Sequence, residues 1–193
     1  MEYILQLDRG LFYILNTELT VYFLDFFMPF ITTKSNFIEA IVFAWLVIFL
    51  TGKWKDRKIL IIVVFVVLIS DLAANVLKEI IQRVRPCNAL PEVRLLVGCT
   101  ESFSLPSGHA TNAFAVATYL SYTYRRYIPV FFFLAVLVAY SRIYVGVHYP
   151  LDVAGGALLG SSWAVIAVEA DRRLSPAAVS WFNKRFGIER QQG

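Results

Sequence analysis

Three short stretches, far apart in the chain, carry side chains that together suit the binding and transfer of a phosphate group. They read LKEIIQRVRP at 77–86, PSGH at 106–109 and SRIYVGVHYPLD at 141–152. The first and third supply the cations Lys78, Arg85 and Arg142, and the second supplies a Ser-Gly turn. The chain has only two histidines, His109 and His148, and each lies in one of these stretches. The pattern indicates acid–base or nucleophilic chemistry on an anion.

The three cations favour an anion because guanidinium groups bind phosphate oxygens in pairs and lysine supplies a point charge. A single Lys or Arg at a helix end usually snorkels to the lipid headgroups, which explains any one of them alone. In PSGH, Pro106 suits the start of a helix because it has no N–H to leave unpaired. Gly108 lets backbone N–H groups approach an oxyanion at that positive helix end. Ser107 fits either a helix N-cap or a further phosphate donor.

The two histidines suit two different chemical roles, one as a base or nucleophile and the other as a general acid. His148 precedes Asp152 by four residues, a spacing that places both on one face of a helical turn. A carboxylate bonded to one ring nitrogen fixes the tautomer and leaves the other nitrogen as a base or nucleophile. His109 would then protonate the departing oxygen as general acid, while the three cations stabilise the transition-state charge. A lone histidine at a helix end is more often structural, and that alternative stays open for each.

The composition places these stretches in a membrane protein. Of the 193 residues, 58% are hydrophobic and 17% are charged, with a mean hydropathy of +0.62, whereas soluble domains carry about 25% charged residues. We expect a single domain, residues 1–193, folded as an all-α integral membrane bundle of five transmembrane helices. The predicted spans are 36–51, 59–81, 108–124, 128–144 and 151–170. The basic residues flank these spans and form no single stripe, which argues against nucleic acid as a partner.

The first 33 residues differ from a regular span. Ile4, Leu7 and Leu11 recur at helical spacing opposite polar residues that include Asp8, which predicts a helix lying in the membrane interface. Residues 19–33 are apolar but interrupted by an aspartate and a proline, so we expect a short half-buried segment, with a sixth full span as the alternative. The N-terminus lacks a basic start before an apolar run, so no cleaved signal peptide is expected.

Basic residues predict the orientation in the membrane. They concentrate in the link at 51–58, in the link at 124–127 and in the C-terminal tail. The tail contributes Arg172, Arg173, Lys184, Arg185 and Arg190. These segments share one end of the predicted bundle, which the positive-inside rule assigns to the cytoplasm. The three chemical stretches all fall at the opposite end, so we expect them to meet at one depth on the outer side.

The ordered set resembles the three-part signature of the type 2 phosphatidic acid phosphatase superfamily. The signature K-x6-R-P, P-S-G-H and S-R-x5-H-x3-D is matched at every position, by Lys78, Arg85, Pro86, Pro106, Ser107, Gly108, His109, Ser141, Arg142, His148 and Asp152. The resemblance implies a phosphatase that needs no metal or other cofactor and passes through a phosphohistidine on His148. It implies His109 as the acid and Asp152 as the orienting carboxylate. The implied phosphate-binding residues are Lys78, Arg85, Ser107, Gly108 and Arg142.

The resemblance also implies a membrane lipid as the substrate. Bacterial relatives act on undecaprenyl diphosphate, phosphatidylglycerol phosphate, phosphatidic acid or lipid A 1-phosphate, and by analogy we favour lipid A 1-phosphate. We expect a multi-pass protein of the bacterial inner membrane with its site on the periplasmic face. Bacterial membrane members usually have six spans, so five would be a departure at the N-terminus. The sequence predicts no oligomeric state.

Three other functions fit part of the pattern. A lipid-to-lipid phosphotransferase would use the same site but pass the phosphoryl group to a second lipid instead of water. A vanadium haloperoxidase has a similar anion site, but those proteins are soluble. A non-catalytic transporter or scaffold for anionic lipids explains the cations and the spans, but it leaves the two histidines and Asp152 without a role.

Asp71 is an acid within the second predicted span. Asn75 and Lys78 lie on the same helical face, four and seven residues later. A charge inside a span is a functional candidate by default. We expect Asp71 to line the bundle interior and hold one of these two residues, because the inferred chemistry needs no carboxylate at that depth.

The loop between the second and third predicted spans holds both cysteines, Cys87 and Cys99. In an oxidising compartment they would pair, and closing this loop would stabilise the protein by about 3 kcal/mol. Two unpaired thiols are the alternative. The same loop contains RLLVG at 94–98, which fits either a segment dipping into the bilayer or ordinary loop packing.

Overall fold

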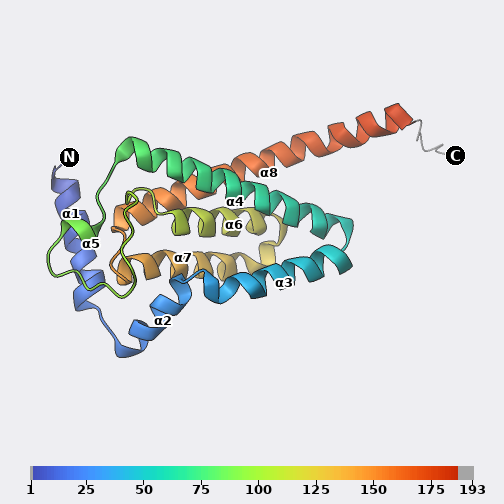
Figure 1. Ribbon diagram of the computed structural model, residues 1–193. Helices are drawn as coiled ribbons and strands as arrows, with labels where there is room; N and C mark the ends of the chain where they lie inside the picture. The colour runs from blue at the N-terminus through green and yellow to red at the C-terminus, as the bar shows by residue number, and fades with distance from the viewer. Residues whose placement is uncertain (1, 187–193) are drawn as a thin grey trace.

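The computed structural model describes the backbone of residues 2–186 and the side chains of residues 2–174. This part of the chain is nearly all helix and has no strand, as the predicted all-α class requires. In chain order the elements are α1 (Glu2–Tyr13), the π-helical turn η1 (Ile14–Glu18), α2 (Tyr22–Thr32), α3 (Ser35–Thr51), α4 (Trp54–Ile81), α5 (Pro86–Ala89), α6 (Gly108–Thr123), the 3-10 turn η2 (Arg125–Tyr127), α7 (Ile128–Tyr144) and α8 (Pro150–Phe186). The long helices run side by side, and α1 lies across one end of them (Figure 1).

Each predicted span lies almost entirely within its own helix, namely α3, α4, α6, α7 and α8. The largest difference is at the end of α8, which continues to Phe186 instead of stopping near residue 170. By length and apolar composition, three helical segments of the described chain are able to cross a membrane: Trp54–Ala89, Arg125–Tyr144 and Pro150–Leu174. The α1–η1 segment and α2 make a fourth if this pair, bent by 115°, is one span. The count of five spans stays a prediction.

Helix α6 packs against α4, α7 and α8. Its buried residues include small ones such as Thr111 and Ala115, which let neighbouring backbones approach closely. Helix α8 meets it with glycines: a Cβ at Gly160 would lie 1.9 Å from the carbonyl oxygen of Thr111, and one at Gly156 would lie 2.6 Å from that of Ser107. This contact fixes the start of α6 beside the first turns of α8.

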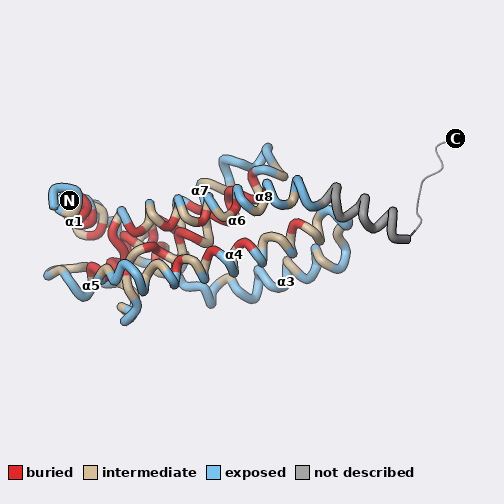
Figure 2. Tube along the Cα trace, turned by 90° about the horizontal axis from the view of Figure 1, so that it is seen from above, coloured by how far each residue is buried: buried red, intermediate tan, exposed pale blue. Residues whose placement is uncertain are grey.

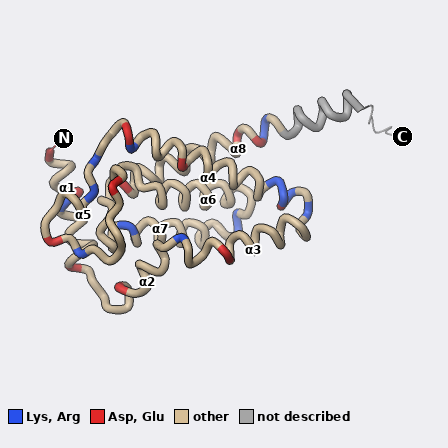
Figure 3. The backbone as a smooth tube through the Cα atoms, in the orientation of Figure 1, with Lys and Arg blue, Asp and Glu red and all other residues tan. Residues whose placement is uncertain are grey.

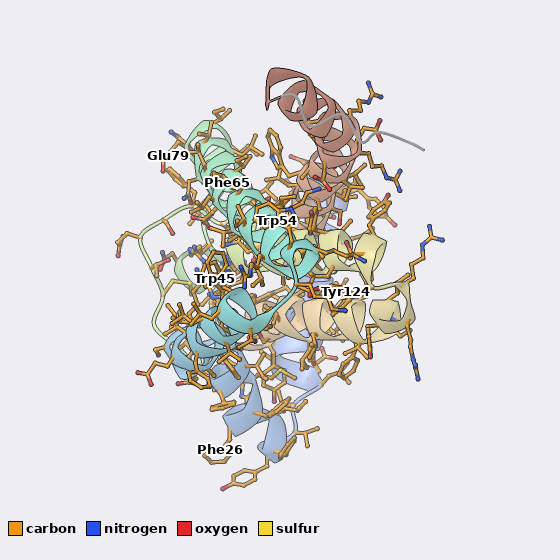
Figure 4. The ribbon with its side chains drawn as sticks, turned by 90° about the vertical axis from the view of Figure 1, so that its right-hand side faces the viewer. Phe26, Trp45, Trp54, Phe65, Glu79 and Tyr124 are labelled. Carbon is orange, nitrogen blue, oxygen red and sulfur yellow. A yellow bond between two sulfur atoms is a disulfide. The ribbon has the colours of Figure 1, made fainter. Side chains whose placement is uncertain are left out.

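The outer faces of the helices are strongly apolar. Helix α3 has no buried residue along its length (Figure 2). Large side chains such as Phe26 and Trp54 have 65% and 75% of their surface exposed, and Phe26 points away from the bundle in Figure 4. Exposed apolar surface on this scale marks a face that contacts lipid or another protein. Buried residues gather toward the end of the bundle that carries α1 and α5 (Figure 2).

Basic residues occupy both ends of the bundle and are scarce between them (Figure 3). The α3–α4 link and η2 lie at one end, opposite α1 and α5, as predicted (Figures 1 and 3). At that same end, Lys58 of α4 pairs with Asp171 of α8 at 2.6 Å. The side chains of Lys184 and Arg185, and all of Arg190, lie outside the described residues, so this part of the predicted basic face is not covered.

One polar side chain of the N-terminal helix, Asp8, is not placed as the amphipathic pattern predicts. The sequence placed Asp8 on a polar face turned away from the apolar residues, but Asp8 is only 4% exposed and lies against the bundle. The apolar side chains of Ile4 and Leu7 are exposed, at 57% and 56%, as a helix in the membrane interface requires. Helical periodicity could not predict the partners of Asp8, which are the side chain of Arg83 and the backbone N–H of Leu151. The position of this helix in the membrane interface stays a prediction.

A second anchor holds the N-terminal segment in place. The side-chain amide of Asn16, in η1, donates to the carbonyl oxygens of Tyr144 and Arg94 at 2.8 and 2.9 Å. Its oxygen accepts the backbone N–H of Arg94 at 2.9 Å. Helix α2 then continues through its internal proline, with Asp25 accepting a hydrogen bond from the hydroxyl of Tyr144 at 2.6 Å. Residues 2–32 are therefore built into the same end of the bundle as the predicted site.

Candidate active site

The first and third stretches meet at His148. Its Nε2 lies 3.1 Å from Nη1 of Arg85. The same guanidinium donates to the carbonyl oxygens of Ser102 and Val147, at 2.7 and 3.1 Å. Because a guanidinium has donors only, Nε2 is the acceptor and directs a lone pair at the arginine. The ring proton of a neutral His148 is then on Nδ1.

Asp152 lies beside that second ring nitrogen. Its Oδ2 is 3.5 Å from Nδ1 of His148. The same oxygen accepts hydrogen bonds from Ser104 Oγ and from the backbone N–H of Tyr149, the latter at 2.8 Å. His148 lies in the short connection before α8, which begins at Pro150, and Asp152 lies in the first turn. The predicted contact between the two side chains is confirmed.

The His148 ring is buried, with only 2% of its surface exposed. Burial lowers the pKa of His148 from 6.5 to about 4. The hydrogen bond to Asp152 opposes this shift, while the charges of Arg85 and Arg142 add to it. The imidazole is therefore neutral at pH 7, with Nε2 unprotonated.

The second stretch begins α6 next to Asp152. The backbone N–H of Ser107 donates to the carbonyl oxygen of Asp152 at 2.9 Å. Ser107 occupies the N-cap position, but its side chain makes no capping hydrogen bond, and its hydroxyl is buried without a partner. Of the two alternatives for this serine, the side-chain cap is thus not formed. At the next residue, a Cβ added to Gly108 would lie 3.7 Å from Nζ of Lys78, so the lysine approaches the bare start of the helix.

Thr32, the last residue of α2, joins the two remaining site residues. Its carbonyl oxygen lies 3.2 Å from Nε2 of His109, and its hydroxyl accepts a hydrogen bond from Nη1 of Arg142. The Nε atom of Arg142 is buried without a partner. The carbonyl oxygen of Arg142 also accepts the backbone N–H of His148, at 3.3 Å. All eight predicted site residues are thus brought to one end of the bundle, as expected from hydropathy and charge.

Comparison with known proteins identifies the family. Residues 59–175, which include all three stretches, match the family model of the PAP2 superfamily. The chain belongs to the PAP2 superfamily. The resemblance read from the motifs is therefore confirmed.

Several relatives of this PAP2 chain carry the names of lipid phosphatases. An undecaprenyl-diphosphatase of Sulfolobus acidocaldarius is 37% identical over 61% of this chain, which spans little more than half of that relative, 57% of its length. A lipid A 4′-phosphatase of Porphyromonas gingivalis is 34% identical over 83% of this chain and 71% of its own. The solved transmembrane PAP2-type phosphatidylglycerolphosphate phosphatase of Bacillus subtilis is 27% identical, with a TM-score of 0.72 over 90% of this chain and 88% of that chain. The PAP2 chain is thus a multi-pass membrane protein.

Several residues that hold the PAP2 site in place were not predicted, among them Arg83, Asp8 and Ser104. Arg83 lies inside the first stretch but off the signature, and Asp8 was placed on the polar face of an interfacial helix. Each carried a usable signal, since a charge in a membrane-embedded segment usually has a buried partner. Ser104, which donates to Asp152, lies in an irregular loop and carried no signal in the sequence.

Asp71 has the interior role that the sequence suggested. Its Oδ2 accepts a hydrogen bond from the side-chain amide of Asn75 at 3.3 Å. Its Oδ1 accepts another from Asn112 of α6, at 3.1 Å. The predicted contact with Asn75 is confirmed, and the contact with Asn112 shows that Asp71 also joins α4 to α6.

The loop between α4 and α6 is closed by a disulfide between Cys87 and Cys99, as predicted. Within the RLLVG segment, Leu96 and Val97 pack against a core cluster that contains Tyr144. Ordinary loop packing therefore describes these two residues. The disulfide and this packing hold the loop that supplies Ser102 to Arg85.

Proposed function

We propose that the protein is a lipid phosphatase that hydrolyses a phosphate or diphosphate monoester on a membrane lipid. One observation carries the proposal: the Nε2 lone pair of His148 faces the donor of Arg85, while Nδ1 faces the carboxylate of Asp152. This arrangement suits nucleophilic attack by Nε2, because the carboxylate orients the ring and stabilises the positive charge that develops on it. The names of the relatives support the same class of reaction and of substrate.

The reaction runs in two steps. A phosphate oxygen takes over the N–H of Arg85, and the freed Nε2 of His148 attacks phosphorus. The bond between phosphorus and the lipid oxygen breaks, and His109 gives its proton to that oxygen. His109 then removes a proton from a water molecule, which attacks the phosphohistidine, releases inorganic phosphate and restores Nε2. Arg85 and Arg142 stabilise the charge on the equatorial oxygens in both steps.

Two unused donors support phosphate binding at this site. The hydroxyl of Ser107 and the Nε of Arg142 are buried without hydrogen-bond partners, a state that costs about 1–3 kcal/mol for each group. A phosphate oxygen satisfies such donors. The positive N-terminus of α6 at Gly108, with Nζ of Lys78 near it, is the third group of the proposed phosphate-binding site.

A groove beside His109 suits the hydrocarbon part of the substrate. It has a volume of about 490 Å³ and lies between α2, α3 and α7. Its walls are mainly aliphatic, with Phe37, Ile38 and Leu134 among the lining residues, and Lys34 and His109 are its only ionisable groups among the described residues. A lipid chain in this groove would bring its phosphate to the histidine that protonates the leaving oxygen.

The proposal extends to a substrate class and a location. We favour lipid A 1-phosphate, undecaprenyl diphosphate or phosphatidylglycerol phosphate, processed on the periplasmic face of a bacterial inner membrane. Two features support this face: the disulfide lies at the site end, which fits an oxidising compartment, and the basic α3–α4 link lies at the opposite end. The reaction uses cationic side chains in place of a metal, so activity should survive an excess of chelator.

Phosphate release from a panel of lipids in detergent micelles tests the proposal. The panel contains lipid A 1-phosphate, undecaprenyl diphosphate, phosphatidylglycerol phosphate and phosphatidic acid, each with and without chelator. We expect release from at least one lipid by the wild type and none by His148→Ala, with unchanged lipid binding. Full activity of His148→Ala would refute the nucleophile. Transfer of phosphate to a second lipid would identify a phosphotransferase, and binding without turnover would identify a transporter or scaffold.

A further inference from the structure

Arg83 joins the carboxylate that orients His148 to the N-terminal helix. Its Nη1 donates to Oδ1 of Asp152 at 2.7 Å, and its Nη2 donates to Oδ2 of Asp8 at 2.5 Å. Both carboxylates are almost completely buried, with side-chain exposures of 0% for Asp152 and 1% for Asp8. One guanidinium therefore neutralises two buried acids, which would each be costly without it.

The two oxygens of Asp152 have different tasks. Oδ2 faces His148 and is shared with Ser104 and the backbone N–H of Tyr149. For Oδ1, Arg83 is the side-chain partner. A carboxylate held at both oxygens cannot rotate, so Arg83 keeps Oδ2 directed at the imidazole. The guanidinium of Arg83 also lies 4.0 Å above the ring of Tyr149. This contact holds the guanidinium in position.

Asp8 holds Arg83 from the other side and is itself anchored to α8. Its Oδ1 accepts the backbone N–H of Leu151 at 2.8 Å, one of the unpaired donors in the first turn of that helix. Phe12, one turn further along α1, is fully buried, and its ring centre lies 5.6 Å from that of Tyr149. Helix α1 therefore docks on the residues that flank Asp152.

We infer that Arg83 and Asp8 are positioning residues for turnover: Arg83 fixes the orienting carboxylate Asp152, and Asp8 fixes Arg83. The N-terminal helix thereby sets the alignment of His148 although it contributes no group to the reaction. This inference rests on the proposed role of His148 as nucleophile. Neither residue is needed to hold phosphate, so their loss lowers kcat and leaves KM nearly unchanged.

The charges around His148 give the inference a distinctive signature. Asp152 of α8 favours a proton on the ring, while Arg85, Arg142 of α7 and the nearby His109 of α6 oppose it. Removing Arg83 leaves the charge of Asp152 less compensated, so His148 holds its proton more strongly. In a plot of kcat against pH, the rise of kcat at low pH, here called the acidic limb, then moves to higher pH. Removing the charge of Asp8 leaves Arg83 acting on Asp152 alone, and the limb moves to lower pH.

The test measures phosphate release from dioctanoyl phosphatidic acid by the full-length protein in detergent. For Arg83→Gln we expect kcat to fall by about tenfold to a hundredfold, as for other residues that orient a reacting group through a ligand. Asp8→Asn keeps an acceptor for Leu151 and should show a smaller loss. Arg83→Lys retains the charge and should restore the position of the acidic limb, but not full kcat, because one ammonium cannot form the guanidinium fork.

The matched control is Arg94→Gln. Arg94 forms a similar ion pair with Asp25, which ties α2 to the outer loop without touching the site. This variant should lower the thermal midpoint and leave kcat and the acidic limb unchanged. If Arg83→Gln does not fold, the double variant Asp8→Asn with Arg83→Gln removes both charges and should show the same loss of kcat.

A folded Arg83→Gln protein with wild-type kcat, or with an unmoved acidic limb, would overturn the inference. Equal shifts of the limb in the same direction for the Arg83 and Asp8 variants would do so as well. Absence of turnover by the wild type on this lipid and on the whole panel would instead reject the proposed function, and the inference with it. If the wild type turns over the lipid and Arg83→Gln does so with the same kcat and the same acidic limb, only the positioning role is rejected.

Discussion

The backbone N–H of Ser107 donates to the carbonyl oxygen of Asp152 across 2.9 Å. Two helix starts, α6 and α8, are thus joined through main-chain atoms at the centre of the candidate site. Their alignment depends on how closely the two helices approach, and not on the side chains of Ser107 and Asp152. Substitutions that separate the helices should therefore disturb the site without changing any reacting group.

Gly160→Ala tests this close approach. The added Cβ would lie 1.9 Å from the carbonyl oxygen of Thr111, a contact that only backbone movement relieves. We expect a loss of stability of about 1–3 kcal/mol or more, together with lower activity, measured as the thermal midpoint and kcat in detergent. The control is Gly10→Ala in α1, where no atom lies within 4 Å of the added Cβ. A Gly160→Ala protein as stable as Gly10→Ala would contradict the packing argument.

Ser104→Ala tests the second support of Asp152. The serine donates to Oδ2 of Asp152, the same oxygen that faces His148. Since a hydrogen bond to a charged group contributes about 1.5–3 kcal/mol, we expect kcat to fall by about tenfold or more with little change in KM. Ser162→Ala serves as the control, because its hydroxyl bonds only within α8, to the carbonyl oxygen of Leu158. Equal kcat values for the two variants would show that Ser104 does not orient the carboxylate.

Acidification should weaken the fold through His148. Burial lowers its pKa from 6.5 to about 4, so between these values the unfolded chain binds a proton that the folded chain does not. The free energy of unfolding therefore decreases as pH falls through this window, by up to about 1.4 kcal/mol per pH unit. Thermal midpoints of the wild type and His148→Gln, measured from pH 7 to pH 4, give the comparison. The wild type should lose stability more steeply, and parallel curves would contradict the neutral buried imidazole.

Reduction of the disulfide should affect both stability and the site. The bond between Cys87 and Cys99 closes a loop with a sequence separation of 12, and its loss should cost about 3 kcal/mol. Since Ser102, in the adjoining segment, binds the guanidinium of Arg85, we also expect weaker phosphate binding and a higher KM. Alkylation with and without reductant, read by mass, checks that the bond is present. A Cys87→Ser, Cys99→Ser protein with unchanged midpoint would show that the loop is held by packing alone.

The sequence was informative about helices and less so about their polar contacts. Hydropathy located α3, α4, α6, α7 and α8, because a helix surrounded by lipid must be continuously apolar. Charge placement then brought the three motifs to one end. Hydropathy and charge placement depend on neighbouring residues or on sums along the chain, so both can be evaluated without knowledge of the tertiary structure.

The contacts of Asp8 and Arg83 depend on a different kind of information. An aspartate opposite an apolar stripe is expected to face water, yet Asp8 is buried, while Ile4 and Leu7 are exposed as an interfacial helix requires. In a membrane protein, apolar residues suit the outer surface as well as the core, so periodicity shows two faces without saying which one is inside. The partner of Asp8 determines which face is buried, and this partner, Arg83, lies 75 positions further along the chain.

The long-range anchors of residues 2–32 have a consequence for biosynthesis. Asp8 binds Leu151, Asn16 binds Tyr144 and Thr32 binds Arg142, over separations of 143, 128 and 110 positions. A ribosome delivers the N-terminal partners early and the others more than a hundred residues later. Residues 2–32 are therefore synthesised well before the residues that hold them in place. The contacts that hold the candidate site can therefore form only after the beginning of α8 has been synthesised.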